Sequence, residues 1–576
     1  MKHHVFFCGL AAVMTISSAS AVAEDRTRTA TPIKHLVVIF QENVSFDHYF
    51  GSYPNALNNA GETPFAALET TPRSINNLLT PLDVNNSFAP LEGVDLMGKN
   101  PNGPFGSGAA INGSDASNPF RLSPAQARTS SQDHEDLAEQ LADDNGKMDA
   151  FPSSTGRGGA PKGYGKNIVM GYYDGNTVTA LWNYAQHFAL NDNSWTTTFG
   201  PSTPGALNLI SGQTNGIDAA LNVVDGSGKL LHPSNEVKDG NGNYTVIGDV
   251  DPLLDACSKS TIDQVMMHGP NIGDLLNARD ISWGSFMGGF DLTITNPNGT
   301  SGCARSSATR APGASQAATP DYIPHHAWFQ YYASTRNAVH ARPKSMAAIG
   351  HTRDPLTGEI DPANHAYDIH DFFEALDAGN LPAVSFLKAP AFQDGHPGYS
   401  NPIDEQNFVV SVVNALQKRA EWANTAVIIA YDDSDGWYDH QMPPIVNPSF
   451  TAADGLNGPG VCHRGLQPGL PSPTAPLDGA FGRPAQGRCG YGTRMPLLVI
   501  SRFAKFNFVD HTLTDQTSVL RFIEDNWLAG QRIQPGGSFD AIAGSLTTMF
   551  DFDRRENDKA HDLFLDPATG AVVSAP

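Results

Sequence analysis

Four apolar stretches rich in β-branched residues constrain the fold of this 576-residue chain more than any other feature. They do not alternate apolar with polar residues, so both faces of each predicted strand must be buried. Segments with helical periodicity lie between them, which is typical of an α/β domain whose mostly parallel sheet is sandwiched between helices. The predicted strands are residues 35–40, 384–387, 426–430 and 496–500, and the predicted helices are 135–143, 178–187, 272–278, 407–423 and 514–527.

The N-terminus predicts the compartment of the protein. Lys2 is followed by an apolar run at residues 5–16 and then by small residues up to Ala23. This pattern indicates a secretory signal peptide at residues 1–23, cleaved after Ala23, and hence a secreted or periplasmic protein. The apolar run is shorter than the roughly 20 residues of a membrane-spanning helix. No later segment is long enough either, so we expect no stable membrane anchor.

The charge of the chain argues against one class of partner. The sequence has 36 Lys and Arg against 59 Asp and Glu, a formal charge of -23, and loss of the signal peptide with its single charged residue makes it -24. A protein that binds nucleic acid through phosphate contacts has a basic excess or a basic stripe, and this sequence has neither. We therefore expect no nucleic-acid partner.

Four cysteines remain after residue 23, namely Cys257, Cys303, Cys462 and Cys489. An even number in an exported protein favours two disulfides. The local pairing, Cys257 with Cys303 and Cys462 with Cys489, is our hypothesis among three possible connectivities. A zinc site is the weaker interpretation because the sequence contains no CxxC spacing.

Residues 24–576 are interpreted as one domain, because no segment has the composition of a linker between independent domains. Three stretches look like long loop insertions into that domain. They lie at about residues 100–118, 301–319 and 451–492, where Gly, Pro, Ser or Ala accumulate.

Oxygen-bearing side chains follow two of the predicted strands. Glu42 and Asn43 come after the first, and Asp432 and Asp433 come after the third. Open α/β sheets bind ligands at the carboxyl ends of their strands, and these side chains offer the hard oxygen donors that divalent cations prefer. The residues alone leave an alternative open, a helix N-cap at Asn43 or Ser45.

The segment after the third strand holds four aspartates within eight residues: Asp432, Asp433, Asp435 and Asp439. Their mutual repulsion is costly unless a cation or hydrogen bonds compensate it, and a metal is the simplest explanation. The spacing does not fit an EF-hand. A solvated acidic turn is the alternative.

Ser202 is the candidate nucleophile. Gly200 and Pro201 turn the chain before it, and an apolar run after it would place Ser202 near a helix N-terminus, which favours a phosphate. Beside a metal its hydroxyl could lose a proton and attack phosphorus. A helix cap is the alternative. The α/β-hydrolase interpretation is weakened because no GxSxG motif occurs.

Three histidines lie in contexts that suggest chemistry: His134 in QDH, His326 in PHHAWF and His396 in DGHP. An imidazole can bind a phosphoryl oxygen or protonate a leaving alkoxide.

Taken together, seven motifs resemble the bacterial phosphoesterases that include secreted phospholipases C and an acid phosphatase. The resemblance covers most of the chain after residue 23. The motifs are IFQENVSFDHYFG (39–51), DHEDLAEQLADDNGKMDAF (133–151), TFGPSTPGALNLISG (198–212), NIGDLLNARDISW (271–283), YDDSDGWYDH (431–440), GYGTRMPLLVIS (490–501) and HTLTDQTSVLRFIE (511–524).

The resemblance implies an alkaline-phosphatase-like three-layer α/β/α sandwich and one catalytic divalent metal ion. By motif position it implies Glu42, Asn43, Asp432 and Asp433 as protein ligands, with the Ser202 oxygen completing the shell. It also implies that His134, His326 and His396 hold the phosphoryl group and assist the leaving group. Oxygen-only ligation suits Ca, Mg, Mn or Fe better than structural zinc.

Departures from the family pattern favour its acid phosphatase branch. Ser202 stands where the phospholipase C branch typically has Thr, and Asp432–Asp433 where that branch has an Asp-Glu pair; Val44 replaces an Arg common in the family. We therefore expect a secreted phosphomonoesterase acting on small phosphate esters. The alternatives are a phospholipase C that cleaves phosphatidylcholine-type lipids at the head group and, more remotely, a non-catalytic binding protein on the same fold.

Overall fold

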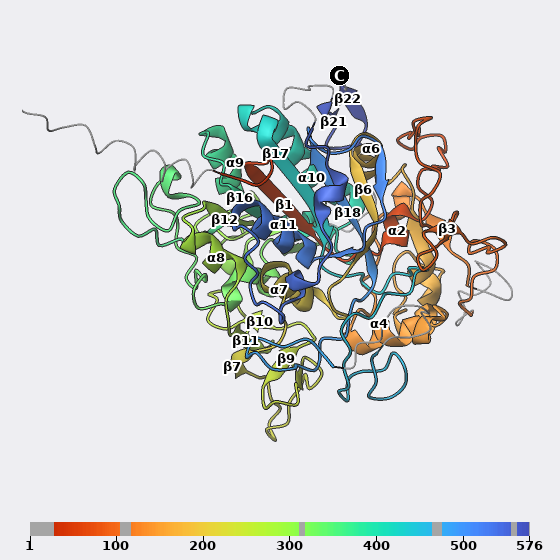
Figure 1. Cartoon of the computed structure of the whole chain (residues 1–576), viewed down its shortest axis with the longest axis horizontal. Helices are drawn as coiled ribbons and strands as arrows, with labels where there is room; N and C mark the ends of the chain where they lie inside the picture. The colour runs from red at the N-terminus through yellow and green to blue at the C-terminus, as the bar shows by residue number, and fades with distance from the viewer. Residues whose placement is uncertain (1–27, 104–116, 310–316, 464–474, 554–560, 575–576) are drawn as a thin grey trace, which may run out of the picture.

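The computed structural model of the chain describes residues 28–103, 117–309, 317–463, 475–553 and 561–574 (Figure 1). The predicted signal peptide lies outside these residues, as do the middle parts of the three predicted loop insertions, at 104–116, 310–316 and 464–474. Within the described part of the chain, no helix has the length and apolar character needed to cross a bilayer.

A nine-stranded sheet forms the centre of the molecule (Figure 1). Every neighbouring pair in it is parallel except the two pairs made by β18, which is antiparallel to both neighbours. The strand order is β15 (Ala366–Asp368), β12 (Trp283–Met287), β16 (Val384–Lys388), β1 (His35–Gln41), β17 (Thr425–Tyr431), β18 (Arg494–Ser501), β6 (Ala189–Trp195) and β19 (Phe508–Asp510), with β20 (Thr514–Asp515) also paired to β6.

Helices pack on this sheet in two groups, which gives the predicted three-layer α/β/α arrangement. In one, α6 (Thr179–His187) contacts α10 (Pro402–Gln417); in the other, α7 (Ser202–Ser211) contacts α8 (Ile272–Ala278) and α11 (Thr517–Trp527). The other α-helices in the described residues are α2 (Phe46–Phe50), α4 (Asp136–Asp143), α5 (Phe151–Ser154) and α9 (Ile369–Asp377). Smaller sheets lie outside the central one. In one of them β11 (Gln264–Met267) pairs in parallel with β10 (Asp251–Pro252) and antiparallel with β7 (Ile217–Leu221), and in another β8 (Glu236–Lys238) pairs antiparallel with β9 (Tyr244–Val246).

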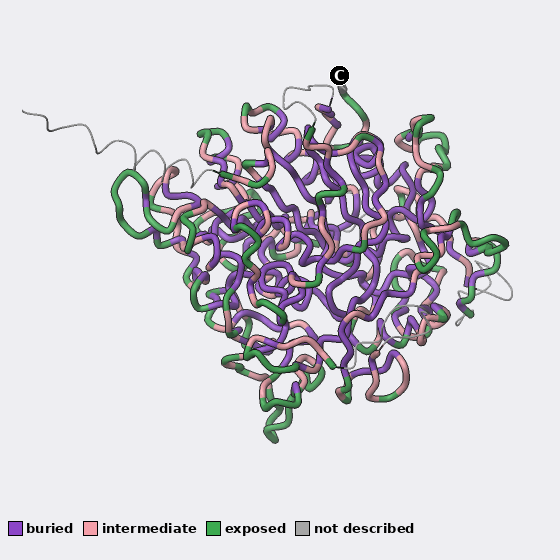
Figure 2. Tube along the Cα trace, viewed as in Figure 1, coloured by how far each residue is buried: buried purple, intermediate pink, exposed green. Residues whose placement is uncertain are grey.

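The central strands carry the hydrophobic core, as Figure 2 shows by the buried tube at the middle of the molecule. Residues 36–40 of β1 and 426–430 of β17 are all buried, so neither strand has a solvated face. Each large aliphatic side chain buried in this way contributes about 1.5–3 kcal/mol to folding. All four predicted strands are confirmed as members of the sheet.

Two helices have boundaries that lie several residues from the predicted ones, and each shifted start has a local cause. The predicted helix 407–423 begins earlier, as α10 at Pro402, since the Asn401 side chain accepts hydrogen bonds from the Ile403 and Asp404 amides and Pro402 fits the first helical position. It ends at Gln417. The predicted helix 514–527 begins at Thr517, because Thr514 and Asp515 pair with β6 as β20.

Strand β6 was not predicted, because its sequence ALNDNSW contains four consecutive polar residues. They are nevertheless buried and bonded. Asn191 donates to Asp510 Oδ2 at 3.1 Å, and Asp192 accepts from the Asn76 amide at 2.7 Å and from His511 Nδ1 at 2.6 Å. Buried polar side chains need such partners, and a single sequence does not reveal them.

The two predicted disulfides are present. Cys257 pairs with Cys303, whose Cα atoms lie 5.3 Å apart, and Cys462 pairs with Cys489 at 6.0 Å. All four cysteines are therefore used in the local pairing.

Candidate functional site

The candidate site forms where β1 and β17 end side by side. These strands are parallel neighbours with Gln41 opposite Tyr431, so the residues that follow them emerge at the same edge of the sheet. The Asn43 amide donates to Asp432 Oδ1 at 3.0 Å. Glu42, Asn43, Asp432 and Asp433 are all buried. The structure thus brings together the four residues that the sequence grouped.

Ser202 is the first residue of α7 and lies against these carboxylates. Its Oγ donates at 3.1 Å to Glu42 Oε2 and at 3.0 Å to Asp433 Oδ2, and the residue is 1% exposed. Helix α7 approaches the Asp432 backbone closely at Gly205. A Cβ there would lie 2.4 Å from the Asp432 carbonyl oxygen, so only glycine permits this approach.

The N-terminus of α7 offers fewer free N–H groups to a phosphate than an ordinary helix. The Thr203 amide donates to Asp249 Oδ1 at 3.0 Å, and Pro204 has no amide hydrogen. The carboxylate of Asp249 is therefore the anion that caps this helix.

The site carries more negative charge than its environment readily tolerates. Burial raises the pKa values of Glu42 and Asp433, and the neighbouring Asp432 raises both further. Among the described residues, neither Asn43 Oδ1 nor Asp432 Oδ2 has a hydrogen-bond partner, although both are buried. Unpartnered buried oxygens are costly, and they are the atoms that a cation would take as ligands.

His134 and His396 lie on one side of this group, with ring centroids 6.1 Å apart and planes at 77°. His134 Nε2 is 3.5 Å from Asn43 Nδ2, and its Nδ1 lies 3.0 Å from the Gln132 carbonyl. Burial lowers the pKa of His134, but Asp433, Asp435 and Asp249 outweigh that effect and raise it to about 10. Burial and the charge of His134 lower the pKa of His396 to about 3.

His326 contacts the acidic group from another side. Its Nδ1 lies 3.1 Å from Glu42 Oε1. The adjacent His325 lies near two other carboxylates. Its Nε2 is 3.9 Å from Asp249 Oδ2, and its Nδ1 is 3.7 Å from Asp251 Oδ1. All three histidines singled out from the sequence thus lie around the carboxylates, and their roles stay predictions.

Sequence reasoning missed Lys388 and Asp394. Lys388 is the last residue of β16, the neighbour of β1, and its ammonium group contacts Glu42 Oε1. Burial lowers the pKa of Lys388, but Glu42, Asp432 and Asp394 outweigh that effect and raise it. The sequence contains one signal that could have identified Lys388, a single lysine at the end of the apolar strand VSFLK. It lies at the same edge of the sheet as the acidic residues that follow β1 and β17.

Glu139 of α4, also missed, joins two loops of the site. Its Oε1 accepts from Ser434 Oγ at 2.5 Å, and its Oε2 accepts from the Gly200 amide at 3.2 Å. It thereby ties the aspartate-rich loop to the turn that presents Ser202. Burial raises the pKa of Glu139 to about 7, although the hydrogen bonds from Ser434 and Gly200 oppose the shift.

The four aspartates after β17 divide into separate groups, which corrects the expectation that one cation explains them all. Asp432 and Asp433 lie beside Ser202. Asp435 accepts hydrogen bonds from Ser131 Oγ at 2.9 Å and the Gln132 amide at 3.0 Å, and at the edge of the site its Oδ1 lies 3.5 Å from Asn43 Nδ2 and 3.3 Å from His134 Nδ1. Asp439 belongs to a buried ion cluster away from Ser202.

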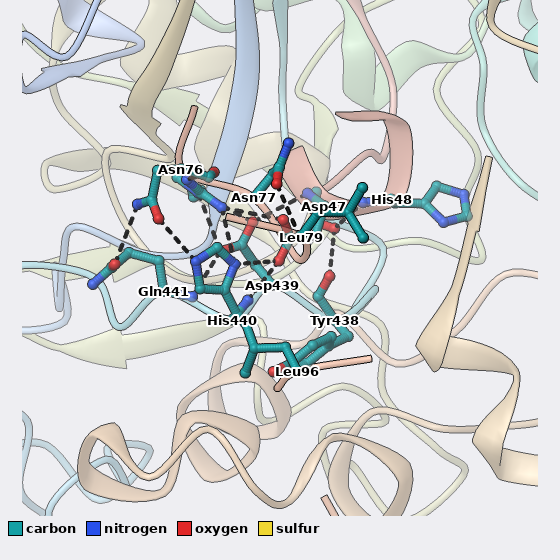
Figure 3. Close-up of polar contacts among 12 residues, drawn as sticks. Asp47, His48, Asn76, Asn77, Leu79, Leu96, Tyr438, Asp439, His440 and Gln441 are labelled. Atoms are coloured by element: carbon teal, nitrogen blue, oxygen red, sulfur yellow. Dashed lines mark hydrogen bonds and ion pairs between the residues drawn. The ribbon is translucent and has the colours of Figure 1, made fainter. Parts of the chain in front are cut away.

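That ion cluster anchors the aspartate-rich loop to helix α2. The Asp47 carboxylate accepts from the His440 amide at 2.8 Å and from its Nδ1 at 2.6 Å, contacts that Figure 3 shows from the side. Asp439 accepts from the Asp47 amide at 3.2 Å and from Arg494 Nε at 3.1 Å. Because α2 follows Glu42 and Asn43 directly, this cluster fixes the two acidic strand ends relative to each other.

Comparisons with known proteins agree with the motifs. The model of the Phosphoesterase family matches residues 33–529. The hemolytic phospholipase C of Pseudomonas aeruginosa is 25% identical over 544 residues, which cover 93% of this chain and 58% of that protein. The non-hemolytic phospholipase C of the same organism is 32% identical over 34% of this chain and 27% of its own length. Phospholipase C A of Mycobacterium tuberculosis is 28% identical over 36% of each.

The chain thus spans between about a quarter and just over half of the length of these relatives. Among solved structures, murine ectonucleotide pyrophosphatase/phosphodiesterase 5 in complex with AMP is 12% identical and covers 64% of this chain and 94% of that one, with a TM-score of 0.29.

We expect Arg494→Met to lower the free energy of unfolding by about 3–5 kcal/mol, because it leaves Asp47 and Asp439 buried without their cation. Urea unfolding with the disulfides intact measures the change. The double variant R494M/D439N should recover part of the loss. The control is R157M, since Arg157 forms an exposed ion pair with Asp133. A loss of less than 1 kcal/mol in R494M would contradict the anchoring role.

Glu139 predicts a pH dependence of stability. Its pKa is near 4.5 when unfolded and about 7 when folded, so the folded state binds the proton more tightly. The free energy of unfolding therefore falls as pH rises from about 4.5 to about 7, by up to about 3 kcal/mol from this group. Glu139→Gln should lose less stability than wild type between pH 5 and pH 8 in urea titrations. The exposed Glu374→Gln variant serves as control, and an unchanged slope in E139Q would refute the prediction.

Proposed function

Because the chain belongs to the Phosphoesterase family, we propose that it is a phosphoric ester hydrolase with Ser202 as its nucleophile. The observation that carries the proposal is the position of Ser202 Oγ, which hydrogen-bonds both to Glu42 after β1 and to Asp433 after β17. A hydroxyl held by two carboxylates at the start of a helix has partners able to accept its proton and a fixed direction of attack.

The residues fit one divalent cation held by Glu42, Asn43, Asp432, Asp433 and the Ser202 oxygen. All the donors are oxygens, and Asn43 Oδ1 and Asp432 Oδ2 lack partners among the described residues. Such a donor set suits Ca, Mg, Mn or Fe. When bound, the cation would supply Lewis-acid stabilisation of negative charge and favour the ionised serine.

The other side chains have roles in binding and proton transfer. Ser202 would attack phosphorus and form a phosphoserine, which water then hydrolyses. His134, which lies next to Asn43, and its neighbour His396 would hold phosphoryl oxygens through their N–H groups, and His134 would protonate the leaving alkoxide. His326 would act at the same phosphoryl group while its Nδ1 contacts Glu42.

We propose small phosphomonoesters as the preferred substrates. The support is the burial of Ser202 at 1% exposure among buried carboxylates, a position better suited to a small phosphate ester than to a bulky one. Phospholipase C activity is the second candidate, favoured by the names of the relatives. We further propose export, which the two disulfides support, and a mature chain that mass spectrometry would find starting at Glu24.

Ser202→Ala should reduce hydrolysis to background while leaving vanadate binding, measured by calorimetry, within about threefold of wild type. The reason is that the variant removes the nucleophile but not the groups that bind the phosphoryl oxygens. Ser411→Ala is the control, because Ser411 lies on α10, where its hydroxyl donates a hydrogen bond to the Asn407 carbonyl of the same helix. Full activity in S202A would exclude the mechanism.

The substrate class is decided by parallel assays with p-nitrophenyl phosphate and phosphatidylcholine across pH, with and without a chelator. We expect the phosphomonoester to be hydrolysed faster and chelation to abolish the activity. Dominant release of phosphocholine would reverse the order of the two candidates. Absence of hydrolysis for every ester tested with metal present would favour the non-catalytic binding protein instead.

A further inference from the structure

A buried ammonium group lies against one of the proposed metal ligands. The Lys388 side chain is 3% exposed, and its Nζ contacts Glu42 Oε1. The other oxygen of that carboxylate, Oε2, accepts the hydrogen bond from Ser202. Glu42 therefore contacts the ammonium group of Lys388 through one oxygen and the hydroxyl of Ser202, part of the proposed metal site, through the other.

The side chains around Lys388 form a second set of metal donors. Glu42, His326 and Asp394 each offer a ligand atom, and these atoms lie within 4.8 Å of one another. Two carboxylates and one imidazole are a common donor set for divalent metals.

Two of these donor atoms are buried without a hydrogen-bond partner in the described part of the chain, Asp394 Oδ2 and His326 Nε2. Both residues also line a small, partly enclosed pocket together with Lys388. Unpaired donors that line one pocket indicate a cation position that the protein's own hydrogen bonds do not fill.

Many phosphoesterases use two metal ions about 3.5–4 Å apart, with a carboxylate near both. The geometry of Glu42 fits such a bridging carboxylate, since Oε2 faces Ser202 and Oε1 faces His326 and Lys388. In this chain, however, the position for a second metal ion lies beside the ammonium group of Lys388, which is part of the protein. An ammonium group and a divalent ion cannot both lie against the same carboxylate oxygen without strong repulsion.

We propose that Lys388 is a positioning residue that takes the place of a second metal ion, which keeps the centre mononuclear. Its ammonium group balances Glu42 and Asp394 and holds Glu42 so that Oε2 stays directed at Ser202. The inference rests on the proposed function for the presence of the first metal ion. It concerns how many ions the site binds, and not which ester is hydrolysed.

The test counts Mn²⁺ ions in the full mature chain by equilibrium dialysis and by electron paramagnetic resonance. Wild type should bind one ion per chain and give the spectrum of an isolated Mn²⁺, even with Mn²⁺ in excess. Lys388→Met keeps the length of the side chain but removes its charge, so it should bind two ions with an exchange-coupled spectrum. Lys388→Arg restores the charge and should bind one.

Asp394→Asn supplies the matched control. In the K388M background it removes a ligand of the second position and should return the count to one ion, and in wild type it should leave the count at one. Two ions in wild type, or one ion in folded K388M, would overturn the proposal. If K388M does not fold, as judged by circular dichroism, K388Q takes its place with the same expected count of two.

Hydrolysis of p-nitrophenyl phosphate by the same preparations separates this inference from the proposed function. If the ion counts are as expected but no ester is hydrolysed, the proposed function is refuted and the role of Lys388 stands. If wild type hydrolyses the ester but binds two ions, the role of Lys388 is refuted and the proposed function stands.

Discussion

Repulsion among buried carboxylates at one edge of the sheet is the constraint on which the rest of the structure depends. Parallel pairing of β1 with β17 forces Glu42 next to Asp432 and Asp433, and β16 adds Asp394 nearby. Burial makes each charge more expensive, which is why the pKa values of Glu42, Asp433 and Asp394 all rise. The surrounding elements are arranged to compensate these charges.

The compensation is divided between two clusters that do not share a cation. Around Ser202 the positive groups are Lys388 and His134, with histidines able to meet a phosphoryl group. Around α2 the cation is Arg494, which neutralises Asp47 and Asp439. The second cluster contains no part of the proposed reaction centre, yet it fixes the loop that carries Asp432 and Asp433. Replacing residues in either cluster should therefore affect the other through the backbone between them.

The sequence was sufficient for features that depend on local pattern. Continuous apolar runs predicted β1, β16, β17 and β18. The oxygen donors that follow β1 and β17 predicted that the ends of these two strands meet. It was insufficient where the partner is distant in the chain. Strand β6 is buried although polar, because its side chains bond to Asp510 and Asn76. Lys388 and Glu139 likewise have partners that lie far away in the chain, since Lys388 contacts Glu42 and Glu139 accepts a hydrogen bond from the Gly200 amide.

A fixed cation beside Glu42 changes what the site demands of its metal. A lysine cannot be removed by chelation or exchanged for another ion, so only one ion has to be acquired. The disadvantage is charge, since an ammonium group carries one positive charge where a divalent ion carries two. More of the negative charge on a transferring phosphoryl group must then be met by hydrogen-bond donors. In the proposed mechanism these donors are His134, which lies beside Asn43, and its neighbour His396.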